Sequence, residues 1–327
     1  MIPCFIEAIV AHQPRGRLDT HDLVARVPGW DAEKVIKKTG IHSRPIVAPG
    51  ETASDLAAIA AEKLFAGGVD RAEIDALILV TQSPDYVLPA SACLLQARLG
   101  LRDTTAAFDV NLACSGLPYM LWLGRSLIAS GSARKVLLLF ADTYSRYCRD
   151  DVTIASLFSD GAAAVLLGAD EKRAIAKVGP SLLGTDGASG EALIVRQGGA
   201  RSAARGEPFT PLQLEMDGPA IFSFALARIK PQVEALLGQV GTTKDDVDRW
   251  YLHQANKFML EALRTKLGVA AERCPIDVAD VGNAATASLP MLLARQLAAG
   301  AIPPRCRSLV IGFGVGLSWG TSWVEWV

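Results

Sequence analysis

The sequence has little of what defines several large classes of protein. Its 33 basic and 34 acidic residues leave a net charge of only -1, without any block of basic residues. This balance argues against nucleic-acid binding as the main task, because such binding needs a clustered basic surface. An intrinsically disordered chain is also disfavoured, since 50% of the residues are hydrophobic.

Cysteine and long apolar runs are scarce too. The 327 residues include six cysteines, which form no CxxC pair and no Cys/His cluster at zinc spacing. We therefore expect reduced thiols in a cytoplasmic protein, with no metal and no redox cofactor. Apolar runs stay far below the ~20 residues that a membrane helix needs. The first residues also lack the basic segment of a secretion signal, so we expect no membrane contact.

What the sequence does contain is a regular alternation of strands and helices. Short runs of Val, Ile and Leu alternate with segments of helical periodicity, which is typical of a buried, mostly parallel sheet covered by helices. The expected strands are Ala76–Thr81, Ala106–Val110, Lys135–Ala141, Ala162–Leu167, Trp250–Leu252 and Ser308–Phe313. The expected helices are Ala53–Phe65, Ser115–Ser130, Ala220–Leu237, Lys257–Leu267 and Ser288–Ala299.

The chain also repeats itself once. DRAEIDALILV, AFDVNLACSG, SARKVLLLFAD and SDGAAAVLLG are followed, in the same order, by TKDDVDRWYLHQ, PIDVADVGNA, PPRCRSLVIGFG and SWGTSWVEWV. A duplication explains this order better than chance similarity between α/β segments. We expect an N-terminal half at 1–172 and a C-terminal half at 173–327. Sites tend to form where strand ends meet, so the loops after AFDV, WYL, PIDV and LVIG are the candidates.

The loop after AFDV contains a candidate nucleophile, Cys114. This residue lies at the expected start of a helix, where unpaired N–H groups and the helix dipole lower a thiol pKa. Its small neighbours, Ala113, Ser115 and Gly116, allow a substrate to approach. The alternative is a small buried hydrophobic residue, which suits other cysteines of this chain.

The other three loops contain possible partners for this cysteine. His253 ends an apolar strand and is one of four histidines; it could be catalytic or structural. Asn283 could donate hydrogen bonds to a substrate or form an Asx-turn. The alternating glycines of residues 312–320 could aim backbone N–H groups at an oxyanion.

Together these motifs resemble the β-ketoacyl-acyl-carrier-protein synthase III family of the thiolase-like superfamily. The resemblance extends over nearly the whole chain. It rests on KTGIHSR at 38–44, the Cys114 loop, FSDGAAAVLL at 158–167, GTDGASGE at 184–191, HQAN at 253–256, GNAATASLP at 282–290 and GFGVGLSWG at 312–320. The resemblance implies an α/β fold, thiolase-like and duplicated, with α-β-α-β-α layers and two mixed, mostly parallel sheets.

The resemblance also implies a reaction. Cys114 would accept an acyl group from a thioester, usually acyl-CoA, and His253 and Asn283 would hold the malonyl thioester of malonyl-acyl carrier protein. Loss of carbon dioxide would create a carbanion that attacks the acyl-enzyme, in fatty-acid or related lipid or polyketide synthesis. The N–H groups of Cys114 and Val315 would form an oxyanion hole, and Phe313 would shield the malonyl carboxylate. No cofactor is implied, because CoA and phosphopantetheine thioesters are substrates.

The positions for substrate binding depart from the family pattern. The expected substrate or carrier contacts are Lys38, Arg149, Asn256, Lys257 and Leu88. Lys34 stands where the family has a tryptophan, Val152 lies closer than Arg149 to the place of an arginine, and Phe258 replaces another arginine. The family also implies a homodimer in which the loop of Leu88 enters the partner's pocket.

Two other functions stay open at this point. A non-elongating acyltransferase would load Cys114 and pass the acyl group to a hydroxyl or amine. A non-catalytic subunit would only bind acyl carriers. The retained cysteine, histidine and asparagine favour condensation.

Overall fold

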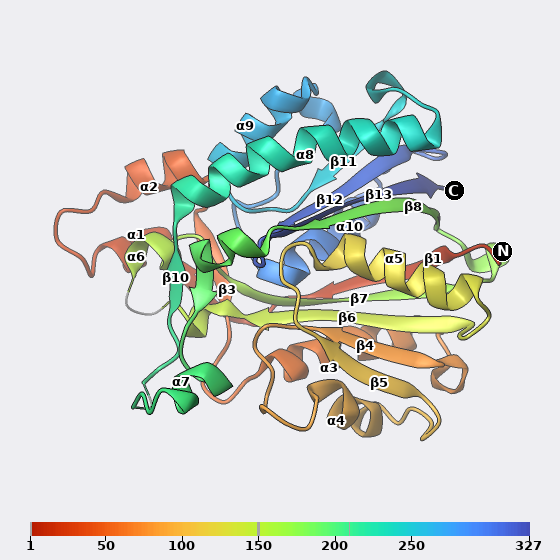
Figure 1. The fold of residues 1–327 in the computed structure, drawn as a ribbon, viewed down its shortest axis with the longest axis horizontal. Coiled ribbons are helices and arrows are strands. Elements are labelled where there is room, and N and C mark those ends of the chain that lie inside the picture. The colour runs from red at the N-terminus through yellow and green to blue at the C-terminus, as the bar shows by residue number, and fades with distance from the viewer. Residues whose placement is uncertain (1, 149–150, 209) are drawn as a thin grey trace.

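The fold is an α/β arrangement of five layers, in which two sheets alternate with three layers of helices (Figure 1). A computed structural model describes residues 2–148, 151–208 and 210–327. Helix α3 covers the outer face of the first sheet and α8 the outer face of the second, while α5 and α10 lie between the sheets. The α helices are α1 (Thr20–Val24), α2 (Ala32–Thr39), α3 (Ala53–Ala66), α4 (Ser91–Arg98), α5 (Gly116–Ala129), α6 (Val152–Ala155), α7 (Ala200–Ala204), α8 (Gly218–Val240), α9 (Lys257–Leu267) and α10 (Ser288–Ala298).

Hydrogen bonds join the two sheets into one nine-stranded ladder with the order β11-β12-β13-β8-β1-β7-β6-β4-β5. The junction is short, with Phe5 paired to Lys177 and Ile6 to Ala176. Its strands are β1 (Phe5–His12), β4 (Ala76–Val80), β5 (Ala106–Val110), β6 (Lys135–Thr143), β7 (Asp160–Gly168), β8 (Ala176–Thr185), β11 (Arg249–Leu252), β12 (Arg307–Gly314) and β13 (Ser318–Trp326). The remaining strands form two small hairpins, β2 (Gly16–Asp19) with β3 (Ser43–Ile46) and β9 (Leu193–Val195) with β10 (Leu214–Met216).

The same order of strands occurs in both sheets. The sequence β4-β6-β7-β1 in the first sheet has its counterpart in β11-β12-β13-β8 in the second, with matching strand directions. The duplicated, layered α/β fold is thus confirmed. The counterpart of β5, residues 275–278, is not a strand. The half boundary at 172/173 stays a prediction.

The expectation of mostly parallel sheets is wrong. Only β4–β5, β4–β6 and β11–β12 are parallel among the described neighbours of the large sheet, and the other pairs are antiparallel. A strand covered by helices on both faces is continuously apolar in either direction, as β7 illustrates with every residue buried. Apolar runs therefore indicate burial and not strand direction.

Local sequence explains where the helices begin and end. Thr52 and Asp55 form a capping box at the start of α3, and Asn256 accepts the Met259 N–H at the start of α9. Gly268 ends α9 in the left-handed conformation, which glycine adopts without steric cost.

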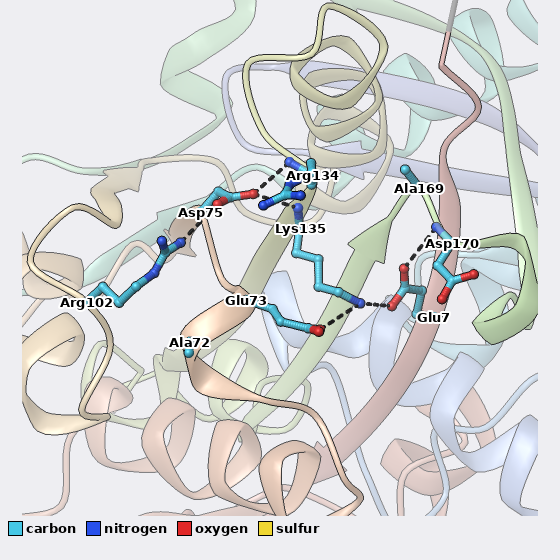
Figure 2. A pocket seen from close by; sticks show the side chains of 9 residues that line it. All are labelled: Glu7, Ala72, Glu73, Asp75, Arg102, Arg134, Lys135, Ala169 and Asp170. Carbon is cyan, nitrogen blue, oxygen red and sulfur yellow. Dashed lines mark hydrogen bonds and ion pairs between the residues drawn. The ribbon is translucent and has the colours of Figure 1, made fainter.

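A charged pocket of about 400 Å³ lies at the end of the first sheet where β4 and β6 begin (Figure 2). Lys135 Nζ lies 2.5 Å from Glu7 and 3.4 Å from Glu73, and Arg102 pairs with Asp75 at 3.0 Å. Lys135 and Glu7 form the buried pair of this pocket, and their attraction offsets the loss of hydration of both charges. In the part of the chain that the structure describes, no helix has both the length and the apolar character for crossing a membrane.

Candidate active site

The thiol of Cys114 lies at the opposite end of the strands, between β5 and α5. Ser115 occupies the N-cap position of α5 without a side-chain capping bond, and Cys114 precedes it, close to the helix start as the strand-turn-helix pattern predicts. The residue is 6% exposed. Burial, with the charge of Asp142 second, raises the pKa of the thiol, against a smaller lowering by a backbone hydrogen bond. The expected low pKa is thus contradicted for the free site, because burial of the thiol outweighs the lowering by the backbone hydrogen bond.

Two glycines of β12 make room for this loop. A Cβ atom on Gly314 would lie 2.8 Å from the Cys114 Cβ and 3.2 Å from its Sγ atom. A Cβ on Gly312 would lie 2.7 Å from the Cys114 carbonyl oxygen. The glycine loop of the second half therefore approaches the thiol of the first half more closely than any side chain would permit. The two halves meet at this point.

His253 follows β11 and is 2% exposed. Its Nδ1 atom lies 2.7 Å from the Ser288 Oγ atom, which leaves Nε2 without a hydrogen-bond partner among the described residues. Burial lowers the pKa of the imidazole to about 3. The ring is therefore neutral near pH 7, which suits a hydrogen-bond donor or a proton acceptor.

Asn283 combines the two interpretations that its sequence left open. Its Oδ1 atom accepts the N–H of Ala285 at 3.0 Å, which is an Asx-turn. Its backbone is fixed against the start of β7, since Asn283 N–H donates to Leu157 O and Ser159 N–H to Asn283 O, both at 2.9 Å. With Oδ1 in the turn, the Nδ2 group stays available as a donor to a ligand.

Phe313 and Val315 occupy the neighbouring part of the glycine loop. The Phe313 ring stands edge-to-face against His253, with centroids 5.5 Å apart and an angle of 84°. Val315 is partly buried, and its carbonyl accepts the Ser318 hydroxyl at 2.6 Å. Ser318 also lies 2.7 Å from the Ser115 hydroxyl, so a hydrogen-bonded pair ties this loop to the residue after Cys114.

One cavity of about 730 Å³ contains Cys114, His253, Asn283 and Phe313 in its lining. Helices α2, α6, α8 and α9, strands β9 and β10 and the adjoining segments contribute to the rest of its wall, which is predominantly apolar. Their contributions include Val35, Ile154, Ile221, Phe222, Phe258 and Met259. An apolar cavity with a few convergent polar groups is the usual form of a small-molecule site.

Some of the residues predicted to bind substrate or carrier line the cavity, and others lie outside it. Lys38 and Asn256 line the cavity. Lys257 is not part of the lining and lies 3.9 Å from Glu261 instead. Leu88 is 80% exposed and lies outside the cavity. Arg149 lies outside the described residues.

The structure adds residues that the motifs did not identify. Trp30 lines the cavity although it precedes the family's tryptophan position, and Phe258 stacks on Phe222 with centroids 5.3 Å apart. Ser288, the partner of His253, stands inside the GNAATASLP motif, which is the signal that could have identified it.

Comparison with known proteins confirms the resemblance. Residues 108–187 match the family described as 3-oxoacyl-[acyl-carrier-protein (ACP)] synthase III, and residues 237–326 match its C-terminal family. A β-ketoacyl-[acyl-carrier-protein] synthase III of Streptomyces coelicolor is 38% identical over 95% of this chain and 93% of its own.

Solved structures are similar over the whole length. A 3-oxoacyl-(acyl-carrier-protein) synthase III is 41% identical, with a TM-score of 0.92 over 99% of this chain and 100% of the other. A 3-oxoacyl-(acyl-carrier protein) synthase of Burkholderia xenovorans is 36% identical, with a TM-score of 0.90 over 99% and 94%.

Proposed function

The chain belongs to the β-ketoacyl-acyl-carrier-protein synthase III family, and we propose that it joins an acyl thioester to a malonyl thioester by decarboxylative condensation. The observation that carries this proposal is the single apolar cavity in which Cys114, His253 and Asn283 converge with Phe313. A nucleophile beside two neutral hydrogen-bonding side chains is the arrangement that acyl transfer followed by enolate formation requires.

The first step loads the enzyme. The Cys114 sulfur attacks the thioester carbonyl, the bond to the CoA sulfur breaks, and the thiol proton leaves with CoA as its own thiol. Because burial raises the pKa of Cys114, the thiol keeps its proton until attack proceeds, and the proton then passes to the departing CoA thiolate. Gly314 leaves the space for the tetrahedral intermediate.

The second step forms the carbon–carbon bond. The malonyl thioester loses carbon dioxide, and the electron pair of the broken bond moves into the thioester to form an enolate. The Nε2–H of His253 and the Nδ2–H of Asn283 donate to its oxygen. The enolate carbon then attacks the acyl-Cys114 carbonyl, the sulfur leaves, and the thiol regains a proton from solvent. A base for carbon acidity is unnecessary, because decarboxylation supplies the electron pair.

The neutrality of the site suits this second step. Phe313 presents a ring edge to His253 and an apolar surface to the cavity. A carboxylate in such surroundings loses hydration, and its conversion to neutral carbon dioxide relieves that cost. We assign Phe313 this role and assign the N–H groups of Cys114 and Val315 to the acyl-enzyme oxyanion.

Intact-protein mass spectrometry tests this function. Wild type is incubated with a panel of acyl-CoAs and then with malonyl-acyl carrier protein, beside Cys114→Ala. The proposal predicts a mass gain in wild type alone, discharged by the malonyl thioester with release of a β-keto product. An acyl-enzyme that only an alcohol or amine can discharge would instead establish a non-elongating acyltransferase.

The thioesters of CoA and of acyl carrier protein are the proposed substrates. Their pantetheine arm is long and of low charge, and the apolar cavity includes Lys38, Trp30 and Asn256 in its lining. Lys38 can neutralise a phosphate at the mouth. We retain Arg149 and Lys257 as proposed carrier contacts. Competition between acyl-CoA and acyl-carrier donors for acylation of Cys114 measures which donor the enzyme prefers.

A homodimer is part of the proposal. Strand β5 ends the large sheet, and apolar side chains beside it are exposed, with Val87 at 90% and Leu88 at 80%. An uncovered sheet edge with apolar neighbours favours pairing with another chain. Leu88→Asp should produce monomers in sedimentation velocity, whereas Val327→Asp, at another exposed position, should not. Wild type sedimenting as a monomer at micromolar concentration would refute the dimer.

A further inference from the structure

A buried carboxylate lies behind the Cys114 loop. Asp142, near the end of β6, is 0% exposed. Its Oδ1 atom accepts the Gln82 backbone N–H at 2.7 Å and the hydroxyls of Thr81 and Ser83, each at 3.2 Å. Its Oδ2 atom accepts the Thr286 backbone N–H at 3.2 Å. The carboxylate thereby joins β6, the segment after β4 and the loop between Asn283 and Ser288.

That loop contains Asn283, contacts His253 through Ser288 and lies beside Gly116, two residues after Cys114. Thr286 lies between Asn283 and Ser288, whose hydroxyl contacts the His253 ring. It also packs on the first turn of α5, since a Cβ on Gly116 would lie 3.2 Å from the Thr286 Oγ1 atom. The hydrogen bond from Thr286 to Asp142 therefore helps to fix how far this loop lies from Gly116, which follows Cys114 and Ser115.

Asp142 has no cationic partner among the described residues. A buried carboxylate without a counter-ion costs stability even when it is hydrogen-bonded. Burial raises its pKa to about 7 against the lowering by its four donors. A polar network in such a place is usually retained for the geometry that it enforces, and here that geometry is the catalytic loop.

We propose that Asp142 is a positioning residue that, through the Thr286 N–H, holds Asn283 and the Ser288–His253 pair against Cys114. This inference rests on the proposed condensing function. Unlike the catalytic side chains, Asp142 is not among the residues that line the cavity. It acts through the loop. The side chain of Thr286 takes no part in the bond, and its Oγ1 atom has no partner among the described residues.

The negative charge of Asp142 has a second effect. It opposes the first half-reaction, the acylation of Cys114, because it disfavours the thiolate. Burial is the main cause of the raised pKa of Cys114, Tyr144 and Tyr147, and the charge of Asp142 is the second cause for all three groups. Asp142→Asn removes that charge while it keeps the side-chain volume. The variant should therefore have a more acidic Cys114 thiol. It should also have a looser loop, because an amide has one oxygen and cannot accept both the Gln82 and the Thr286 N–H as the carboxylate does.

The test compares wild type, Asp142→Asn and two matched variants. Asp142→Asn should lower kcat for malonyl-thioester decarboxylation by roughly 10²-fold, the typical effect of a small misplacement, and change KM much less. The pH midpoint of Cys114 alkylation by iodoacetamide should move to lower pH. Hydrogen exchange of residues 282–288 should become faster.

The matched variants separate position from general damage. Thr286→Ala keeps the backbone N–H and should stay near wild type in all three measurements. Asp160→Asn removes another fully buried carboxylate, one bonded to Val47 and Ser145, and should not shift the Cys114 midpoint. If Asp142→Asn does not fold, Ser83→Ala removes one donor to the same carboxylate and should still accelerate exchange in 282–288.

Unchanged decarboxylation and exchange in folded Asp142→Asn, or an equal loss of decarboxylation in Asp160→Asn, would overturn the inference. Failure of the proposed function is distinguishable, because wild type would then decarboxylate nothing. The alkylation and exchange measurements would still report whether Asp142 holds the loop.

Discussion

His253 Nδ1 and Ser288 Oγ lie 2.7 Å apart, although 35 residues separate them in the chain. The Ser288 hydroxyl is also 3.1 Å from the Ala285 carbonyl, so the serine connects the imidazole to the turn that Asn283 begins. Because Nδ1 is occupied, the ring cannot flip without losing a buried hydrogen bond. Ser288 thereby fixes which nitrogen is free for a substrate.

Ser288→Ala should therefore impair catalysis more than binding. The imidazole loses its anchor, and we expect kcat for condensation to fall by about 10–100-fold with a smaller change in KM. Ser288→Thr keeps a hydroxyl and is the matched variant, so it should recover part of the rate. Steady-state kinetics measures both, and equal rates for alanine and wild type would show that packing alone orients His253.

The buried His253 predicts a pH dependence of stability. Its folded pKa, about 3, lies below the ordinary 6.5, so the unfolded chain binds more protons between these values. Stability is therefore lost as pH falls below 6.5, by about 2 kcal/mol at pH 5 for this residue. His253→Asn should lack that contribution, as urea unfolding at pH 7.5 and 5.0 would measure.

The same group bears on the rate profile. Because the imidazole stays neutral, condensation should not titrate near pH 6.5 through His253. The His253→Asn variant keeps His12, His21 and His42. The difference between wild type and this variant therefore reports on His253 alone. If wild type and His253→Asn lose the same free energy of unfolding between pH 7.5 and 5.0, the pKa assigned to His253 is contradicted.

Gly314→Ala should block acylation by steric contact. The new Cβ would stand 2.8 Å from the Cys114 Cβ, and the thiol or the strand must move. We expect acyl-enzyme formation to slow at least ~10-fold, with a stability cost of about 1–3 kcal/mol. Gly187→Ala meets nothing within 4 Å and should change stability by less than ~0.5 kcal/mol. Time-resolved mass spectrometry and thermal unfolding compare the pair.

Phe313→Leu should separate the two half-reactions. Loss of the edge-to-face contact with His253 should cost about 1 kcal/mol of stability. Acylation of Cys114 should proceed, whereas release of carbon dioxide from the malonyl thioester should slow. Labelled malonyl thioester measures that release, and a parallel fall in both steps would mean that Phe313 only packs the site.

The Cys114, His253 and glycine loops were predictable because each follows a strand whose end is visible in the sequence. Cys114 and His253 follow the ends of β5 and β11, and three of the four residues of β11 are buried. Asn283 followed from the internal repeat. Their convergence in one cavity is what meeting strand ends imply.

Properties that arise from distant contacts were not predictable. The Cys114 pKa depends on burial beneath β12, about two hundred residues away, and no local pattern at the helix start encodes that contact. Strand direction failed for the same reason, since β7 is apolar on both faces whichever way it runs. Trp30 reaches the cavity through packing of the α1–α2 segment, which periodicity does not specify.

The two helices held between the sheets have a consequence for folding. Helices α5 and α10 each contact strands of both sheets, so neither sheet can cover its inner face before the other is in place. Such contacts join residues far apart in the chain and form late, after loop closure. Cys114 and His253 come from different sheets, so catalytic competence should return on refolding only in the last cooperative step, after helical circular dichroism has recovered.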